Sequence, residues 1–461
     1  MTRTDEGTDR PAPSVSFGTS GVRGRVGGTL TADTALSIGR AVATLGADRV
    51  VVGRDVRESG RFLLDAVCAG LTECGADVVD VGVVPTPTVA RAVVGAGADA
   101  GVVVTASHNP PPDNGLKLWT DDGRAFGADR RSRVEELIAS GSYEFADWDG
   151  LGRRTRRSDA AARHEEQLLA STALERDAGG TAVVVDVGNG TGRVTADALA
   201  SAGCDVETLN AQRDGRFPGR PSEPTPDSCS TLSATVANTD ADLGIAHDGD
   251  ADRTVAVDER GRVVRGDALL ALFARRAAAA GDVVTAPLNT SLAVDEALDE
   301  VGVELVRTPV GDAHVAERAA ELGAAFGGEP SGAWIWPGEI PCPDGPLAAC
   351  TLVELVATSG PLSTLVDDLP EHPIRRDAVP SDDLERVVAD VERRLTRRYD
   401  SVTTFDGVRV ETDDGWFLVR ASGTQPLVRL TAEARQAQRA DDLLETARQT
   451  VETAVTTLGD T

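Results

Sequence analysis

The stretch TASHNP, Thr105–Pro110, directly follows the apolar run Val102–Val104 and directly precedes two further prolines, Pro111 and Pro112. The apolar run predicts a short buried strand. Three consecutive prolines exclude a helix that continues directly from it. Ser107 is therefore predicted to lie on a stiff loop at the end of a strand, where α/β proteins place their functional groups.

Lys117 follows this loop, and it is the only lysine among the 46 basic residues, so that arginine supplies the other 45. Arginine cannot lose its proton near neutral pH, whereas a partly desolvated lysine ammonium can. A lone lysine close to a loop serine therefore indicates a chemical task for Lys117. The alternative interpretation is that this lysine has no special task and is present by chance in a chain that otherwise uses arginine.

The net charge of -28 argues against binding to nucleic acid or to an anionic membrane. Abundant carboxylates with almost no lysine are typical of proteins from salt-rich cells, so the composition indicates a halophile. The sequence contains no apolar run of about 20 residues, so no membrane helix is predicted. The polar start of the chain is unlike a signal peptide, and the six cysteines form no C-x-x-C pair, which together predict a cytoplasmic protein.

The domain organisation follows from a repeated pattern of strand, helix, second strand and polar loop, which occurs three times. This pattern predicts three related α/β domains with mixed, mostly parallel sheets, each presenting a loop to one central cleft. A fourth, small α+β domain closes the chain. The predicted divisions are a loose tail at 1–13, α/β domains at 14–155, 156–256 and 257–372, and the α+β domain at 373–461.

The strongest chemical signal is the acidic loop Asp248–Arg253, DGDADR, after an apolar run. Three carboxylates at alternate positions can point inward together and hold a hard cation. A solvated acidic turn is the plain alternative. An EF-hand is disfavoured because Arg253 stands where that loop needs glycine. A phosphatase of the haloacid dehalogenase type is disfavoured because no lysine follows Lys117.

Two other loops are suited to anions. Phe17–Gly24 contains three glycines, two hydroxyl residues and an arginine, and Arg420–Pro426 contains an arginine, two hydroxyl residues and a glycine. Backbone N–H groups of such loops, together with a guanidinium, bind phosphate. A third turn, Gly53–Ser59, carries two arginines between a predicted strand and a helix.

Together these motifs resemble the α-D-phosphohexomutases. The resemblance covers nearly the whole chain and rests on four motifs in the same order: Thr105–Pro110 with Lys117, Asp248–Arg253, Gly328–Gly332 and Arg420–Pro426. It implies four domains around one cleft, phosphoserine at Ser107, one Mg²⁺ per chain and a hexose 1,6-bisphosphate intermediate. The implied reaction interconverts the 6-phosphate and 1-phosphate of a hexose or hexosamine.

The resemblance also implies a role for each matching residue. The catalytic residues would be Ser107, Lys117, Arg253 and His108, the last as an orienting hydrogen-bond partner, and the metal ligands would be Ser107, Asp248, Asp250 and Asp252. Sugar contacts would come from Glu329, Ser331, Gly311 and Asp312. Phosphate contacts would come from Arg420, Ser422, Gly423, Thr424 and Arg429, and a supporting loop from Thr19, Ser20, Arg23 and Arg57.

The sequence departs from common family patterns at three positions: Ala333 replaces a frequent histidine, Gln425 a glutamate and Leu427 a lysine. The sugar loop resembles the glucosamine and the glucose/mannose branches, while Val310–Asp312 is more similar to glucosamine-type and archaeal members. Phosphoglucosamine mutase is therefore expected, with phosphomannomutase/phosphoglucomutase and an inactive sugar-phosphate-binding relative as alternatives. The expected partners are small sugar phosphates, in a monomer or a small homo-oligomer.

Overall fold

The computed structural model describes residues 15–19, 21–422 and 426–459. The chain forms two compact units. The first comprises the chain up to Val263 together with Gly332–Leu362, and the second comprises Val264–Ser331 and the chain from Ser363 onward. The four-domain division and the shared cleft stay predictions.

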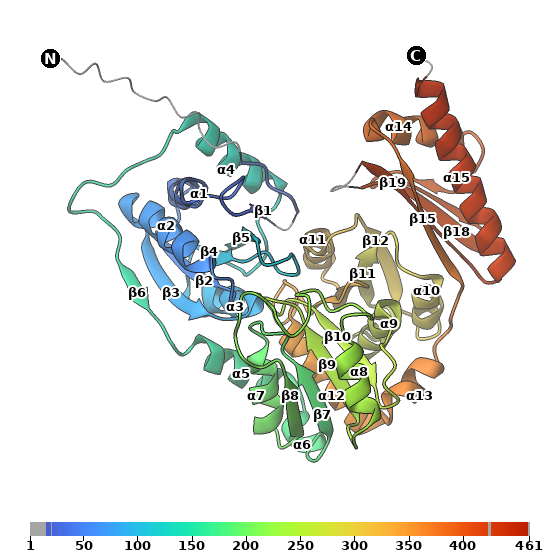
Figure 1. Cartoon of the computed structure of the whole chain (residues 1–461), viewed down its shortest axis with the longest axis horizontal. Helices are drawn as coiled ribbons and strands as arrows, with labels where there is room; N and C mark the ends of the chain where they lie inside the picture. The colour runs from blue at the N-terminus through green and yellow to red at the C-terminus, as the bar shows by residue number, and fades with distance from the viewer. Residues whose placement is uncertain (1–14, 20, 423–425, 460–461) are drawn as a thin grey trace. The chain divides into compact units, whose positions relative to one another are not determined.

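The sheet that carries the serine loop has six strands in the order β1-β5-β4-β2-β3-β6 (Figure 1). Its strands are β1 Val22–Arg25, β2 Arg49–Arg54, β3 Asp77–Val83, β4 Ala100–Val104, β5 Asp113–Thr120 and β6 Arg154–Arg156. Strands β2, β3, β4 and β6 run parallel, whereas β5 is antiparallel to β4 and β1. The helices of this region are α1 Ala32–Thr44, α2 Gly60–Glu73, α3 Thr86–Ala96 and α4 Ala128–Ser140.

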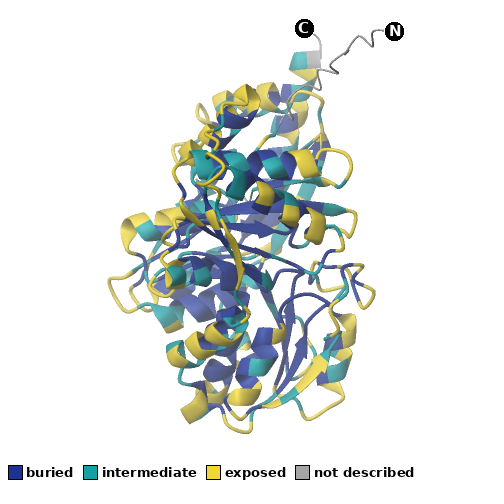
Figure 2. Cartoon of the chain, turned by 90° about the vertical axis from the view of Figure 1, so that its left-hand side faces the viewer, coloured by how far each residue is buried: buried dark blue, intermediate teal, exposed yellow. Residues whose placement is uncertain are grey.

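Alternate residues of the central strands face opposite sides of this sheet, as the strand period requires. Val50 and Val52 belong to a core with α1 and α2, while Val51 and Val103 belong to a separate core with α3. Figure 2 shows most strand segments dark blue, with yellow exposed residues mainly on the outer faces of helices and on loops, while the edge strand β6 is exposed. Because both faces are covered at the centre of the sheet, Val50–Val52 of β2 and Val102–Val104 of β4 are apolar without interruption.

The second sheet of the first unit has the order β10-β9-β7-β8 and carries the acidic loop. It consists of β7 Ala182–Asp186, β8 Asp205–Leu209, β9 Leu243–His247 and β10 Thr254–Asp258, with β10 antiparallel to β9 and the others parallel. The helices here are α5 Ala160–Ser171, α6 Leu174–Asp177, α7 Arg193–Ser201 and α8 Ser230–Ala237. Strand β14, Ala333–Ile335, and helix α12, Gly345–Ser359, also belong to this unit, and α12 packs against α6 and α7.

The second unit contains parallel strands β12, β11 and β13 with β11 in the middle. Their bounds are β11 Val283–Pro287, β12 Glu304–Thr308 and β13 Phe326–Glu329, and the neighbouring helices are α9 Gly266–Ala277, α10 Leu292–Asp299 and α11 Asp312–Leu322. Helix α13, Leu362–Asp367, leads to the last sheet. The carboxyl ends of β12 and β13 lie at the same edge, which brings the loops after them together.

The last sheet is antiparallel and has the order β15-β19-β18-β17-β16. It comprises β15 Ile374–Pro380, β16 Val402–Thr403, β17 Val408–Thr412, β18 Gly415–Ala421 and β19 Leu427–Ala434, with helices α14 Leu384–Leu395 and α15 Ala437–Gly459. Both helices pack on one face through a single apolar core. Sequence reasoning found three of these strands and missed β15 and the two-residue β16.

The predicted fold class is confirmed: three α/β sheets, mostly parallel, precede a small antiparallel α+β region. The antiparallel strand β5 was not foreseen, and it is the strand that carries Lys117. In the part of the chain that the structure describes, no helix is long and apolar enough to cross a membrane.

Helices α1 and α2 approach each other closely at a glycine. A Cβ on Gly70 would lie 2.2 Å from the Leu36 carbonyl oxygen, whereas a Cβ on Gly95 in α3 would meet nothing within 4 Å. Gly70→Ala should therefore destabilise the fold by about 1–3 kcal/mol. Gly95→Ala should stabilise it by up to about 1 kcal/mol, since alanine favours a helix. Calorimetric melting temperatures test this, and equal shifts for the two variants would contradict it.

Candidate active site

Ser107 lies at the end of β4 in a strained backbone conformation. Its φ is 50°, in the left-handed region that non-glycine residues rarely adopt, and the residue is 1% exposed. Its amide donates to the Thr105 hydroxyl at 2.9 Å. Because such a conformation costs free energy, the surrounding structure must hold the loop in place.

The guanidinium of Arg57 holds this loop. Its two terminal nitrogens donate to four main-chain carbonyls of the loop, at Ser107 (2.8 Å), Asn109 (2.6 Å), Pro110 (2.7 Å) and Asp113 (2.9 Å). The arginine is fully buried, so these hydrogen bonds form away from bulk water. Arg57 thus fixes both ends of the serine loop from the turn after β2.

Asp55 compensates the buried charge of Arg57. Its carboxylate accepts from Arg57 Nε at 3.0 Å and from the Thr105 hydroxyl at 2.8 Å, and both members of the ion pair are fully buried. Burial raises the pKa of Asp55, while Arg57 and the hydrogen bond from Thr105 oppose this shift. Removing either partner would leave an uncompensated buried charge.

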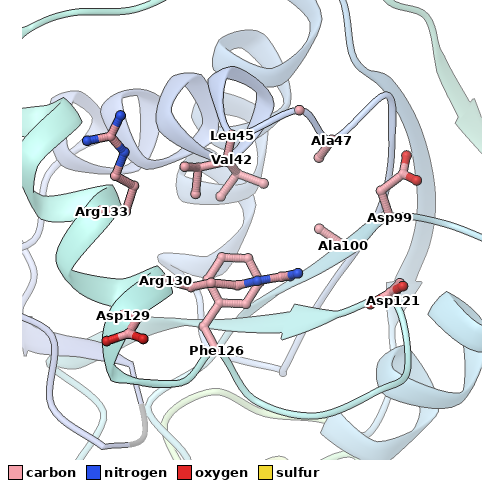
Figure 3. Close-up of a pocket in the computed structure, with 11 residues that line it drawn as sticks. Val42, Leu45, Ala47, Asp99, Ala100, Asp121, Phe126, Asp129, Arg130 and Arg133 are labelled. Carbon is pink, nitrogen blue, oxygen red and sulfur yellow. The ribbon is translucent and has the colours of Figure 1, made fainter.

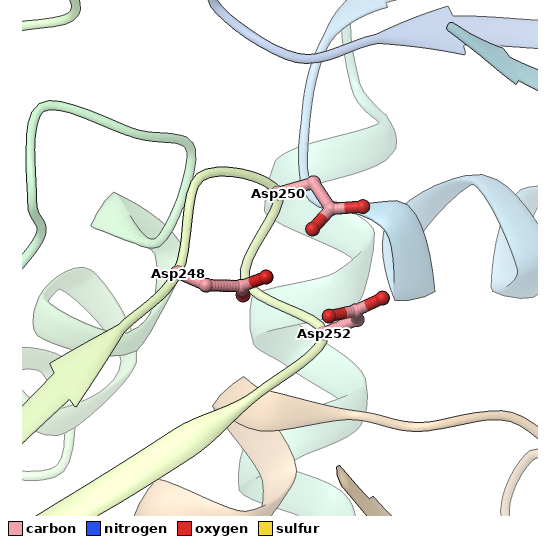
Figure 4. A group of neighbouring side chains, drawn as sticks. All are labelled: Asp248, Asp250 and Asp252. Carbon is pink, nitrogen blue, oxygen red and sulfur yellow. The ribbon is translucent and has the colours of Figure 1, made fainter. Parts of the chain in front are cut away.

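The three acidic residues after β9 converge. Asp248, Asp250 and Asp252 are 1%, 0% and 5% exposed, and each offers an oxygen within 4.8 Å of the others (Figure 4). Ala251, between two of them, has a φ of 53°, so this loop is also in the left-handed region. Ser107 Oγ donates to Asp248 Oδ2 at 2.5 Å and lies 3.4 Å from Asp252 Oδ1. The serine and the carboxylates therefore form one cluster.

Lys117 completes this cluster. Strand β5 places it opposite Val103, and its Nζ lies 2.9 Å from Asp250 and also pairs with Asp252. Burial alone raises the pKa of Asp250, but the Lys117 ammonium and a hydrogen bond from the Thr86 hydroxyl outweigh burial and hold it below its usual range. For Asp248, burial and the two neighbouring aspartates raise the pKa well above its usual range.

The donor set fits a hard divalent cation. All three residues offer carboxylate oxygens, the ligands that Mg²⁺ prefers. Asp250 Oδ1 is buried, and no described residue donates a hydrogen bond to it. Three buried carboxylates face one lysine, so one further cation would offset the remaining negative charge. We infer that Asp248, Asp250 and Asp252 can hold a metal ion beside Ser107.

Two further predicted residues border the cluster. His108 Nδ1 lies 3.4 Å from Ser107 Oγ, and burial together with Arg253, Arg23 and Lys117 lowers the pKa of His108 to about 2. The imidazole is therefore neutral at neutral pH and suits an orienting hydrogen bond. The main-chain N–H of Arg253 donates to Asp248 at 3.2 Å, and its side chain lies 3.6 Å from Glu223.

The predicted supporting loop adjoins the serine loop in part. Arg23 on β1 donates to the Asn109 side chain at 3.4 Å, and β1 pairs with β5 beside Lys117. Thr19 lies in the turn closed by Gly18 and Gly21, where a Cβ on Gly21 would lie 2.2 Å from the Leu116 carbonyl oxygen. Ser20 lies outside the described residues.

The predicted sugar-contacting residues belong to the second unit. Glu329 ends β13 and is 9% exposed, and the Ser331 hydroxyl donates to its carboxylate at 2.8 Å. Gly311 precedes α11 with a φ of 131°, and Asp312 is the first residue of that helix. These residues follow β13 and β12, so they lie at one edge of the parallel strands.

The predicted phosphate-contacting residues lie on neighbouring strands. Arg420 on β18 is directly opposite Arg429 on β19, so two guanidiniums extend from adjacent positions. Ser422 follows β18 and is buried. Gly423 and Thr424 lie outside the described residues.

Sequence reasoning missed three residues that support the site: Asp55, Thr86 and Ser222. Thr86, at the start of α3, bonds Asp250 through its hydroxyl at 2.5 Å, and the Ser222 hydroxyl donates to the Ser107 carbonyl at 2.7 Å. Only Asp55 had a usable signal, since it follows a predicted strand two residues before Arg57.

A cavity of about 520 Å³ lies away from this chemistry. It opens near the amino-terminal ends of β2 and β4 and is lined by residues including Ala47, Asp99, Phe126 and Arg130 (Figure 3). The acidic cluster follows the carboxyl end of β9 instead.

Comparison with known proteins shows which family this chain resembles. Family models described as phosphoglucomutase/phosphomannomutase match all four parts of the chain: alpha/beta/alpha domain I at 14–144, domain II at 163–261, domain III at 265–372 and the C-terminal domain at 378–449.

Full-length relatives are also known. Proteins of Methanopyrus kandleri and Methanothermobacter thermautotrophicus, each described as "probable phosphoglucosamine mutase", are 46% and 45% identical, and each alignment covers 95% of this chain and 98% of the relative. The crystal structure of a phosphoglucomutase/phosphomannomutase family protein from Burkholderia thailandensis is 30% identical, with a TM-score of 0.84 over 95% of this chain and 98% of that one.

Arg57→Lys should loosen the serine loop while keeping the charge beside Asp55. A lysine cannot reach four carbonyls, and at about 1 kcal/mol for each of two lost hydrogen bonds the loop amides should exchange roughly thirtyfold faster. Hydrogen–deuterium exchange of the Ser107, Asn109 and Asp113 amides measures this. Arg61→Lys, at an exposed position of α2, is the matched control. Unchanged protection in Arg57→Lys would show that the loop holds itself.

Mg²⁺ should raise the melting temperature of the wild-type protein, because a ligand at a hundred times its Kd stabilises by about 2.7 kcal/mol. Asp250→Asn should abolish most of this shift, since it removes one carboxylate from the cluster. Asp227→Asn, which removes the same charge at an exposed position, should retain the shift. A full Mg²⁺ shift in Asp250→Asn would rule out metal binding at this cluster.

Proposed function

Because the chain belongs to the phosphoglucomutase/phosphomannomutase family, a family of phosphohexomutases, we propose that it interconverts glucosamine 6-phosphate and glucosamine 1-phosphate. The observation that carries the choice of sugar is the similarity over the whole length to proteins described as phosphoglucosamine mutases. Val310–Asp312, which resembles glucosamine-type members, supports the same choice.

In the proposed reaction Ser107 carries the phosphoryl group. The bond from phosphorus to Ser107 Oγ breaks as a bond to the free hydroxyl of the sugar phosphate forms, and the proton of that hydroxyl passes to Ser107 Oγ, a transfer in which Lys117 would assist. The resulting 1,6-bisphosphate turns over and returns its other phosphoryl group to Ser107. The position of Ser107 Oγ, 2.5 Å from Asp248, supports this role.

The residues around Ser107 suit phosphoryl transfer, in which positioning and charge stabilisation do most of the work. Mg²⁺ held by Asp248, Asp250 and Asp252 would neutralise charge on the phosphoryl oxygens. Lys117 pairs with both Asp250 and Asp252, which offsets their mutual repulsion, and supplies an ammonium within the same cluster. Arg57 holds the main chain of the serine loop through the Ser107 carbonyl.

At the other end of the substrate, Arg420 and Arg429 would bind the phosphate that does not react. Ser422, Gly423 and Thr424 would add donors to the same phosphate. Glu329 and Ser331 would bind sugar hydroxyls, with Gly311 and Asp312 beside them. The hydrogen bond from Ser331 to Glu329 supports a shared role for these two side chains.

Three broader properties belong to the same proposal. The enzyme works in the cytoplasm, as a monomer or a small homo-oligomer. The excess of 74 acidic over 46 basic residues supports a salt-rich cell, in which carboxylates keep the surface hydrated.

The substrate is tested by comparing kcat/KM for glucosamine, mannose and glucose 6-phosphates under identical conditions with Mg²⁺. Glucosamine 6-phosphate should be preferred by at least about tenfold, which corresponds to roughly 1.4 kcal/mol of transition-state discrimination. A preference for the mannose or glucose substrate would favour the alternative mutase. Turnover of none of the three would favour an inactive binding relative.

A further inference from the structure

The carboxylate of Asp406 contacts two loops. One is proposed to bind the phosphate that does not react, and the other is proposed to contact the sugar. Asp406 lies between β16 and β17, in the second unit. One of its oxygens accepts from Arg420 Nε at 2.9 Å, and the other accepts from the Val310 main-chain N–H at 2.8 Å. Arg420 belongs to the phosphate loop, and Val310 begins the turn before α11.

The backbone around Asp406 has little freedom to move. Gly407 has a φ of 82°, and a Cβ there would lie 2.4 Å from the Val419 carbonyl oxygen and 3.1 Å from Arg420 Cα. Only glycine combines this backbone conformation with such a close approach. The loop therefore lies directly on β18, and the position of the Asp406 carboxylate is set by that contact.

The ion pair orients the guanidinium of Arg420. Because Nε donates to Asp406, the guanidinium is held in one orientation, with Nε facing the Asp406 carboxylate. The two terminal nitrogens have no partner among the residues that the structure describes, and the side chain is 30% exposed. This arrangement leaves a two-pronged donor available for a phosphate.

The second hydrogen bond fixes the other loop. Val310 lies between the end of β12 and Gly311. Gly311 has a φ of 131° and leads into α11. By accepting from the Val310 N–H, Asp406 ties the start of this turn to the same carboxylate that orients Arg420. The two loops thus share a single side chain as a hydrogen-bond partner.

We propose that Asp406 is a positioning residue that sets the distance between the arginine of the phosphate loop and the sugar-contacting turn Val310–Asp312. This inference rests on the proposed function. Because the bisphosphate must bind in two orientations, both half-reactions use the same spacing. Loss of Asp406 should therefore weaken the binding of the 6-phosphate and the 1-phosphate by similar factors.

The first test is the steady-state kinetics of Asp406→Ala with glucosamine 6-phosphate and glucosamine 1-phosphate. KM should rise about tenfold for each substrate while kcat changes less than about threefold, because the affected contacts are made in both ground and transition states. The matched control is Asp414→Ala, which removes an exposed ion pair with Arg439 in the same region. It should leave both constants unchanged.

The second test asks whether Asp406 acts through Arg420. In a double-mutant cycle, Arg420→Ala should raise KM, and adding Asp406→Ala should raise it little further. Asp406→Asn, which keeps an acceptor for Val310 but places an amide N–H beside Arg420, should give an intermediate KM and serves if the alanine variant melts early. Fully additive effects, or an unchanged KM in Asp406→Ala, would overturn the inference.

These outcomes separate the inference from the proposed function. If Arg420→Ala strongly raises KM but Asp406→Ala does not, the positioning role is wrong and the phosphate loop is right. If Arg420→Ala itself leaves KM unchanged, the assignment of the phosphate loop fails, and the positioning role fails with it.

Discussion

The fully buried guanidinium of Arg57 is the constraint on which the site depends, because it holds Ser107 in a backbone conformation that the residue would not adopt alone. Five hydrogen bonds from one side chain fix the loop and its counter-ion Asp55. These hydrogen bonds thereby offset the free-energy cost of the backbone conformation at Ser107. The serine oxygen can then face the acidic loop of the second sheet in the same unit.

The acidic loop imposes the complementary constraint of charge. Three buried carboxylates repel one another, and Lys117 is the side chain that lies between two of them. A compact ammonium fits this space, whereas a planar guanidinium is larger and directs its hydrogen bonds in a fixed fan. The residue is 5% exposed, so the surroundings leave little room for arginine. This geometry gives a physical reason why one lysine persists among 46 basic residues.

Much of this arrangement follows from the sequence, but not all of it. The alternate spacing of Asp248, Asp250 and Asp252 predicted that their carboxylates would point inward together. In the structure they do converge, but a turn with Ala251 in the left-handed region, and not an extended chain, brings them together. The pairing of β4 with β5 was not foreseen, since three prolines between them conceal the hairpin that brings Lys117 back to the loop. The role of Asp406 also stayed hidden, because a carboxylate that binds a main-chain N–H and an arginine side chain, both distant in sequence, carries no local motif.

The central claim is that Ser107 carries and exchanges a phosphoryl group. Intact-protein mass spectrometry tests it most directly, on the wild-type protein and on Ser107→Ala, first after incubation with a hexose 1,6-bisphosphate and then after addition of excess glucosamine 6-phosphate. The account predicts one phosphoryl group on the wild-type protein after incubation with a hexose 1,6-bisphosphate, its loss when glucosamine 6-phosphate is added in excess, and none on Ser107→Ala. A phosphoryl group that persists in Ser107→Ala, or that never leaves the wild-type protein, would contradict the account.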